Sequence, residues 1–336
     1  MERIGKVFGV ALAGLRHDHA FALSNKLNAH NRFKILGAFE ENEEARLSAE
    51  KKGITCNYTS YEALLSDKNI EIVALGGCFG DRGIMIIRAL EAGKHVIVDK
   101  PICTTTEQLN RIEALSKERK RVVMCMFSLR YTNKIATVKK IVEDGVLGEI
   151  NNVYIGGQHP LTYERRPAWY FEPGKHGGTI NDIAIHGIDL LSYMLGLKII
   201  KVNAARCWNK YADLKPDFKD SAQFMLTAEN GAGILGDVSY SIPDGVEYGL
   251  PYYWQFFVWG TKGTLRFSIG EDIICYVKEN KNPIELDNSV QSRNYLDDFL
   301  DMLDGEEGII LTQKEVFAST RATLMIQEAA DGSEKS

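Results

Sequence analysis

Short apolar runs alternate with segments of helical length over the first 130 residues, and this alternation constrains the fold most. Strands are predicted at residues 7–13, 33–39, 70–76, 95–98 and 122–126. Helices are predicted between them, at 20–29, 43–52, 61–66, 82–92 and 106–119. Strands that alternate with helices form parallel sheets with right-handed crossovers. The pattern therefore predicts a doubly wound α/β domain of the nucleotide-binding type.

The pattern changes after about residue 130, where strands follow one another with glycine turns between them. Helices are predicted at 132–144 and 179–195, and strands at 201–207, 222–227, 232–239, 255–259, 264–267 and 273–277. Helices at 294–303 and 312–330 close the chain. Runs of strands without intervening helices favour a second, α+β domain with a mostly antiparallel sheet. The 336 residues therefore divide into predicted domains 1–128 and 129–336.

The charge balance is mild, with 40 Lys and Arg residues against 45 Asp and Glu residues and a formal net charge of −5. This balance gives no electrostatic reason to expect nucleic acid or an anionic membrane as a partner. No run reaches the roughly 18 apolar residues of a membrane-spanning helix. The six cysteines form no C-x-x-C pair, so we expect reduced thiols in a cytoplasmic protein, without disulfides or a zinc site. A small-molecule ligand is the remaining expectation.

The turn after the first predicted strand reads Gly14-Leu15-Arg16-His17-Asp18-His19. A dinucleotide-binding turn has the pattern G-x-G-x-x-G, whose glycines let the backbone approach a pyrophosphate at a helix N-terminus. Only Gly14 fits, because Arg16 and His19 stand at the second and third glycine positions. A guanidinium can pair with a phosphate, so this turn supplies four candidate cofactor-binding residues: Gly14, Leu15, Arg16 and His17. A strand–turn–helix connection without a ligand is the alternative.

An acidic residue, Glu40, follows the second predicted strand. An acidic side chain about 20 residues beyond the glycine turn accepts hydrogen bonds from the ribose hydroxyls of a bound dinucleotide. Glu40 would also repel a 2′-phosphate, so it favours NAD over NADP. Its neighbours Glu41, Glu43 and Glu44 leave ordinary surface charge as the alternative.

Two further segments carry ionisable residues at positions that suit chemistry. Lys100 follows the strand at 95–98, where open α/β sheets bind ligands, and Pro101 restricts its backbone to an extended conformation. On the predicted helix 179–195, Asp182 and His186 are four residues apart and share a face with Asp189. A histidine held by a carboxylate is an effective general acid or base. A core histidine with satisfied hydrogen bonds is the alternative, and no metal is predicted because no further His or Cys has ligand spacing.

Together these segments resemble the Gfo/Idh/MocA family, named after glucose-fructose oxidoreductase and inositol dehydrogenase. Residues 89–101 contain ALEAGKHV followed by DKP, similar to the family's ALEAGKHV and EKP. Residues 177–189 match its GG-x(3)-D-x(3)-H-x-x-D pattern. Residues 61–65 (YEALL), 128–131 (SLRY) and 145–150 (GVLGEI) resemble its YEELL, NRRF and G-x-[IL]-G-x-[IV] segments.

The resemblance implies an N-terminal Rossmann domain for the dinucleotide and a C-terminal domain for substrate binding and oligomerisation. By position, Lys100, Asp182 and His186 match the family's catalytic residues. His186 would remove the hydroxyl proton of a sugar or polyol, Lys100 would polarise that oxygen, and Asp182 would orient both. Beyond the glycine turn, residues expected at the cofactor are Glu40, Gly77, Cys78, Asp99, Lys100, Pro101 and Arg130. A homodimer or homotetramer is expected through the open sheet.

The chain also departs from the family pattern, and the departures fall on the cofactor side. The segment that usually reads T-P-N-x-x-H is Gly77-Cys78-Phe79-Gly80-Asp81-Arg82 here. Arg82 therefore stands near the usual His. Asp99 is one methylene shorter than the usual Glu.

The connection 158–176 is rich in aromatic and cationic side chains that would suit a sugar or an acidic sugar derivative. From it we take Tyr163, Trp169 and His176 as substrate-binding candidates, together with Lys100, Asp182 and His186. The aromatic run at 252–257 is expected in the sheet core or at a subunit interface.

The sequence thus predicts an NAD-dependent oxidoreductase acting on a sugar, polyol or related alcohol. The alternatives are a non-catalytic sensor of a dinucleotide or sugar, and NAD-assisted chemistry without net redox, such as glycoside cleavage or epimerisation.

Overall fold

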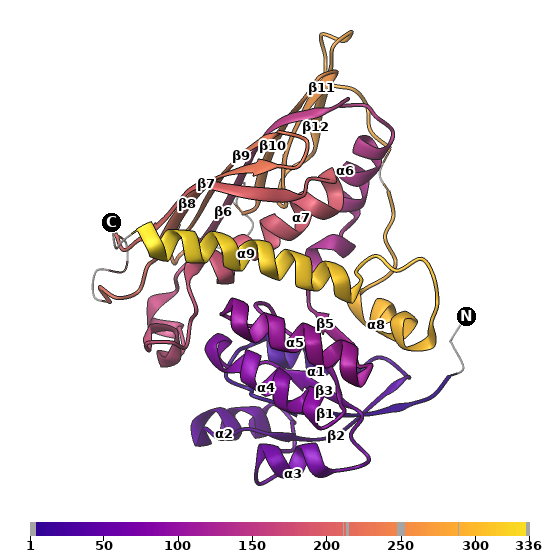
Figure 1. Cartoon of the computed structure of the whole chain (residues 1–336), viewed down its shortest axis with the longest axis vertical. Helices are drawn as coiled ribbons and strands as arrows, with labels where there is room; N and C mark the ends of the chain where they lie inside the picture. Colours follow the sequence, from indigo (N-terminus) through magenta and orange to yellow (C-terminus); the bar gives the residue numbers. More distant parts are fainter. Residues whose placement is uncertain (1–4, 211, 213–214, 247–252, 288, 334–336) are drawn as a thin grey trace. The chain divides into compact units, whose positions relative to one another are not determined.

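The computed structural model describes residues 5–210, 212, 215–246, 253–287 and 289–333 (Figure 1). The chain forms two compact units. The first contains Met1–Met126, Gly174–His176 and Tyr295–Phe317, and the second contains Phe127–Pro173, Gly177–Asn294 and Ala318–Ser336. Each unit is built around a sheet of its own.

The first unit holds a parallel sheet of five strands, which confirms the predicted α/β class. Its strands are β1 (Phe8–Ala13), β2 (Phe33–Phe39), β3 (Ile72–Leu75), β4 (His95–Val98) and β5 (Val123–Cys125). Its helices are α1 (His19–Asn28), α2 (Glu43–Lys51), α3 (Tyr61–Ser66), α4 (Phe79–Glu91), α5 (Thr106–Arg119) and α8 (Tyr295–Asp304). The strand order is β2-β1-β3-β4-β5, so the order reverses beside β1. Ligands of open α/β sheets bind at such a reversal, beyond the carboxyl ends of the strands.

Helix α4 begins three residues earlier than the sequence predicts. The prediction started it at residue 82, after a glycine-containing segment, but its first turn begins at Phe79. Gly80 is needed there, because a Cβ atom at this position would lie 1.9 Å from the carbonyl oxygen of Gly174. The earlier start places Phe79 and Arg82 in the first turn, next to the strand ends.

The second unit holds a seven-stranded sheet that is antiparallel except for one pair, as the α+β prediction implies. Its strands are β6 (Ile150–Pro160), β7 (Ile199–Trp208), β8 (Ser221–Ala228), β9 (Gly233–Ile242), β10 (Gln255–Gly260), β11 (Gly263–Ser268) and β12 (Ile274–Val277). The order is β12-β11-β10-β6-β9-β8-β7, with β6 and β9 parallel. Helices α6 (Asn133–Glu143) and α7 (Ile185–Leu195) pack against each other, and α7 packs on β6 (Figure 1). Helix α9 (Gln313–Ser333) is the last element.

The sequence analysis missed β6, the central strand of this sheet. Its sequence, INNVYIGGQHP, contains two Asn, two Gly and a Pro, so it lacks the apolar run or strict alternation that indicates a strand. The strand forms because both of its neighbours, β10 and β9, supply backbone hydrogen-bond partners along its length. Tertiary pairing outweighs local propensity here.

Acid sensitivity of the first unit is expected from His95, at the start of β4. Its Nδ1 accepts a hydrogen bond from the Val122 N–H at 3.0 Å, and burial lowers the pKa of His95 to about 4. Because the unfolded histidine titrates near 6.5, the unfolded state takes up a proton first as the pH falls. We expect the free energy of unfolding to decrease between about pH 6.5 and pH 4.

Urea unfolding at pH 7 and at pH 5 checks this expectation. In His95→Asn an amide oxygen can replace Nδ1 as the acceptor without titrating, so the variant should lose less stability between the two pH values than the wild type. An equal loss in both proteins would show that His95 is not responsible.

Candidate functional site

A pocket of about 990 Å³ lies in the first unit at the reversal of strand order. Gly14, after β1, and Gly77, after β3, form part of its wall. Gly14 has φ +69°, and a Cβ atom on it would lie only 2.8 Å from the Cα atom of Gly77. The first glycine of the degenerate turn is therefore required both for its conformation and for the close approach of two strand-end turns.

Glu40 and Arg16 line the same pocket and contact each other. The Glu40 carboxylate accepts hydrogen bonds from the Leu15 N–H at 2.5 Å and the Asn42 N–H at 2.8 Å. Its Oε1 lies 3.3 Å from Arg16 Nε, and Arg16 Nη2 lies 2.8 Å from Glu41 Oε1. The structure thus brings together Gly14, Leu15, Arg16, Glu40, Gly77 and Cys78, six of the predicted cofactor-binding residues.

Lys175 is a pocket residue that the sequence analysis included only within the cation-rich connection 158–176. Its Nζ lies 2.8 Å from Asp81 Oδ1, and its carbonyl oxygen accepts a hydrogen bond from the Gly80 N–H. The short segment Gly174–His176 is far from α4 in the sequence, so no local pattern predicts this contact. The one sequence feature that relates to this contact is Gly80 itself, because only a residue without a side chain fits against Gly174 and Lys175.

Asp99, Lys100 and Pro101 leave the adjacent strand β4, and their side chains are buried. The Asp99 carboxylate lies 3.3 Å from His17 Nδ1 and 3.0 Å from His19 Nδ1. Burial alone would raise the pKa of Asp99, but its electrostatic interactions with His19 and Arg82 outweigh burial and hold this pKa well below its usual value. For His17 the effect of burial has the opposite sign: burial holds the pKa of His17 well below its usual value, which keeps that ring neutral.

The ligand atoms of His17, His19 and Asp99 all lie within 4.8 Å of one another, a spacing that a metal ion would also suit. However, Arg82 Nη2 lies 2.9 Å from Asp99 Oδ2 and is fully buried. The guanidinium already balances the carboxylate, so a divalent cation would add buried charge without compensation. The geometry favours an internal hydrogen-bond network.

In the second unit, Asp182 is buried in a π-helical turn, Ile180–Ala184, which precedes α7. The regular helix predicted from residue 179 is therefore wrong for its first turn. Such turns are rare and are frequent at functional sites. The hydroxyl of Tyr240 donates a short hydrogen bond to Asp182 Oδ2. Burial and the Asp182 charge hold the pKa of Tyr240 well above its usual value, so Tyr240 remains the donor.

His186 follows Asp182 by one helical turn and is half-buried between aromatic rings. Phe127 and Trp254 both contact its imidazole edge-on, with centroid distances of 6.4 Å and 5.8 Å. The Trp254 ring leaves no room for a Cβ atom on Gly187, which would lie 2.9 Å from it. The sequence analysis assigned the run 252–257 to core or interface, and Trp254 is indeed fully buried. Its contact with His186 was missed, and Tyr252 lies outside the described residues.

Arg130, predicted at the cofactor, pairs with Asp189 within the second unit. Its guanidinium is fully buried and donates to both oxygens of Asp189, at 2.7 and 2.8 Å. Ser319 donates to the same carboxylate. This pair of hydrogen bonds connects the 3₁₀ turn Ser128–Tyr131 to α7. Arg130 and Asp189 therefore have a structural role here.

The substrate candidates are divided between the units. Tyr163 and Trp169 lie in the second unit, in 3₁₀ turns, where their rings contact Phe171 and Tyr170. His176 is buried in the first unit against the ring of Phe79. Lys100 belongs to the first unit and Asp182 and His186 to the second, so their joint action is part of the proposed function.

Comparisons with known proteins agree with these two units. Residues 7–127 match the oxidoreductase family with an NAD-binding Rossmann fold, and residues 135–266 match the Gfo/Idh/MocA C-terminal domain. Levoglucosan dehydrogenase of Pseudarthrobacter phenanthrenivorans is 28% identical over 201 residues, which span 58% of this chain and 50% of the relative. Inositol 2-dehydrogenase of Salmonella typhimurium is 25% identical over 69% of this chain and 66% of the relative.

Among solved structures, a putative oxidoreductase from Erwinia carotovora atroseptica has a TM-score of 0.84 at 23% identity. That match covers 96% of this chain and 98% of the other. The same fold therefore extends over both units. Since the two family matches together cover most of the chain, the protein belongs to the Gfo/Idh/MocA family of oxidoreductases.

Proposed function

We propose that the protein is an NAD-dependent dehydrogenase of a sugar, polyol or related alcohol. The observation that carries this proposal is the buried Asp182, held by Tyr240 and followed by His186 one turn later. A carboxylate and an imidazole placed in this way are the groups that proton transfer requires. The curated relatives, a levoglucosan dehydrogenase and an inositol 2-dehydrogenase, support the substrate class.

In the proposed reaction His186 removes the hydroxyl proton of the substrate. Lys100 stabilises the negative charge that develops on that oxygen, and Asp182 orients the imidazole and balances its positive charge. NAD, when bound, supplies the acceptor for the hydride that leaves the carbinol carbon. Tyr163, Trp169 and His176 are the proposed contacts to the rest of the substrate. Leu15, His17, Cys78, Asp99 and Pro101 complete the proposed cofactor surroundings.

Incubation of the purified protein with NAD and a panel of sugars and polyols tests the proposal through the absorbance of NADH. Net NADH formation with at least one compound is the expected result. If the protein binds the dinucleotide and converts a sugar to another product without net NADH formation, NAD-assisted chemistry without net redox would replace the dehydrogenase proposal. Binding without any chemistry on the panel would favour the sensor.

NAD is the proposed cofactor in preference to NADP. The residues fit the group, because the Gly14–Gly77 contact leaves backbone exposed to a pocket of sufficient size and Glu40 stands at its wall. A 2′-phosphate would lie beside this carboxylate, and like charges in contact cost several kcal/mol.

Replacing Glu40 with Gln should therefore narrow the preference for NADH over NADPH by about tenfold or more, since 1.4 kcal/mol is tenfold in affinity. Fluorescence titrations of both cofactors against both proteins measure the change. Glu44→Gln on α2 is the matched control, because Glu44 does not line the pocket. A wild type that binds NADPH as tightly as NADH would contradict the assignment.

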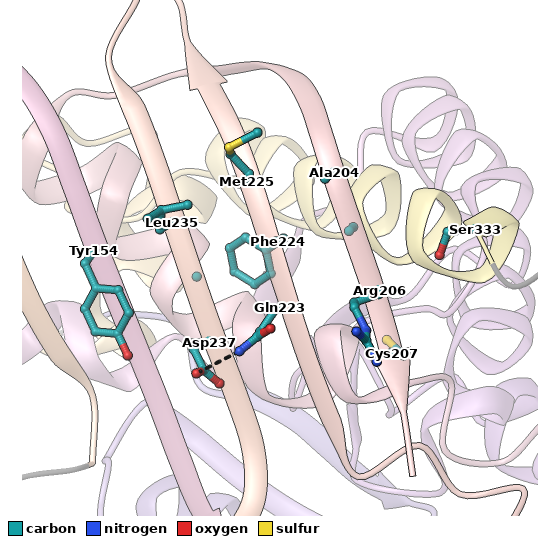
Figure 2. A pocket seen from close by; sticks show the side chains of 12 residues that line it. Tyr154, Ala204, Arg206, Cys207, Gln223, Phe224, Met225, Leu235, Asp237 and Ser333 are labelled. Carbon is teal, nitrogen blue, oxygen red and sulfur yellow. Dashed lines mark hydrogen bonds between the residues drawn. The ribbon is translucent and has the colours of Figure 1, made fainter. Parts of the chain in front are cut away.

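We also propose a homo-oligomer that forms through the open face of the second sheet. Met225, Leu235, Tyr154 and Phe257 are paired in register across four strands, so their side chains form one row on this face. The row includes Met225 at 45% exposure and Leu235 at 54%. Three of these side chains, labelled in Figure 2, line a pocket of about 710 Å³. An apolar row of this kind is typical of an interface.

Leu235→Glu should shift the assembly toward monomers with little change in the melting temperature, because the side chain is already exposed. Sedimentation velocity measures the shift. Leu47→Glu, at a residue 44% exposed on α2, is the control. A wild type that sediments as a monomer would contradict the proposal.

The six cysteines are free thiols, four of them at 2% exposure or less. This supports the cytoplasm as the proposed location, which cell fractionation tests. None of the described helices has both the length and the apolar character needed to cross a membrane.

A further inference from the structure

Three of the residues at which the chain departs from the family pattern contact one another in the first unit. Arg82 stands near the usual His, Asp99 stands where Glu is usual, and His19 stands at a glycine position. Arg82 Nη2 lies 2.9 Å from Asp99 Oδ2, and His19 Nδ1 lies 3.0 Å from Asp99 Oδ1. The departures therefore form one connected set that joins the turns after β1, β3 and β4.

Arg82 is fully buried and uses its guanidinium on the backbone around Lys100. Its Nε donates to the carbonyl oxygen of Gly77 at 3.0 Å. Its Nη1 lies within hydrogen-bond distance of the carbonyl oxygens of Asp99, Lys100 and Pro101. One side chain thus contacts three successive carbonyl groups of the segment that carries Lys100. A planar guanidinium presents five donors in a fixed geometry and can make these contacts together.

The ring of Phe79 connects Arg82 with the amine of Lys100. The Arg82 guanidinium lies 4.6 Å from the centroid of this ring, and Lys100 Nζ lies 5.7 Å from it. Both cations therefore face one buried aromatic ring in the first turn of α4. The position of the Lys100 amine depends on the backbone that Arg82 holds and on the ring that Arg82 packs against.

We infer that Arg82 is a positioning residue for Lys100, and that Asp99 is its size-matched partner. The long side chain of Arg82 reaches the short side chain of Asp99 here. Arg82 contacts no reacting atom in this scheme and acts through Lys100. The inference rests on the proposed function for its effect on turnover, but the placement of the Lys100 amine can be measured without turnover.

A double-mutant cycle that restores the family pair tests the inference. Arg82→Met would leave a buried carboxylate without its partner and would impair folding, so the cycle uses Arg82→His, Asp99→Glu and the double variant. We expect each single variant to lower kcat about tenfold or more, and the double variant to recover to within about threefold of the wild type. Independent residues would instead give the product of the two losses.

Two further readouts separate positioning from a general structural role. The NADH dissociation constant and the melting temperature should change little in the double variant. The chemical shift of the Lys100 amine after reductive ¹³C-methylation, assigned by its absence in Lys100→Met, should move in each single variant and return in the double. Arg111→His, at an exposed arginine of α5, is the matched control and should leave all readouts unchanged.

Wild-type kcat and an unmoved Lys100 signal in both single variants would overturn the inference. So would a double variant as poor as the product of the single losses. If the wild type forms no NADH from any substrate, the proposed function fails, and the Lys100 signal alone still decides whether Arg82 positions this amine.

Discussion

Replacing Lys100 with Met is expected to lower kcat about a thousandfold while NADH still binds. Methionine keeps much of the length of the side chain but removes the ammonium group that stabilises the developing oxyanion. Loss of one such group typically costs a factor of 10²–10³ in turnover. Lys100 is not among the residues that line the proposed dinucleotide pocket, so the NADH dissociation constant should stay within about threefold.

Stopped-time assays of NADH formation, together with fluorescence titration of NADH, measure both quantities on the same protein. Lys140→Met serves as the control, because Lys140 is an exposed residue of α6 that pairs with Asp144. Turnover near the wild-type rate in Lys100→Met would remove Lys100 from the mechanism. A parallel loss of NADH binding would instead assign it to the cofactor.

His186→Ala is expected to lower kcat by a factor of about 10²–10⁴ at neutral pH, the usual contribution of a general base. Its remaining activity should rise with pH, because hydroxide can take the substrate proton when the imidazole is absent. Rates measured between pH 6 and pH 10 therefore distinguish loss of a base from loss of structure. A variant whose activity falls by the same factor at every pH would contradict the assignment.

Trp254→Phe offers a comparison within the same part of the second unit. Phenylalanine preserves an aromatic contact with His186 but has a smaller ring, so kcat should fall far less than in His186→Ala. The two variants together show whether the imidazole itself or its aromatic surroundings supply the rate.

The parallel sheet was predictable from the sequence because each strand is a short apolar run between helical segments. The strand ranges 33–39 and 95–98 and the helix ranges 61–66 and 106–119 match the structure at both ends. The spacing of Gly14 and Glu40 predicted that both lie at one site, and both line the same pocket. Such features depend on local sequence, which a reader of the sequence sees directly.

Features that depend on distant segments were not predictable. Strand β6 forms because β9 and β10 pair with it. Tyr240 reaches Asp182 from β9, and Lys175 joins the pocket of the first unit from a three-residue segment. Arg82 appeared in the sequence only as a departure from a pattern, since four of its five hydrogen-bond contacts are to backbone oxygens whose positions no motif specifies.

The charges around the proposed dinucleotide pocket have one more consequence. Its lining contains four basic residues (Arg16, Arg46, Arg88 and Lys175) and four acidic residues (Glu40, Glu41, Glu62 and Asp81). Most of these side chains form ion pairs with one another. The pocket therefore offers an approaching anion little net attraction over long range. Association should depend only weakly on ionic strength, and affinity must come from shape and short-range hydrogen bonds once the ligand has arrived.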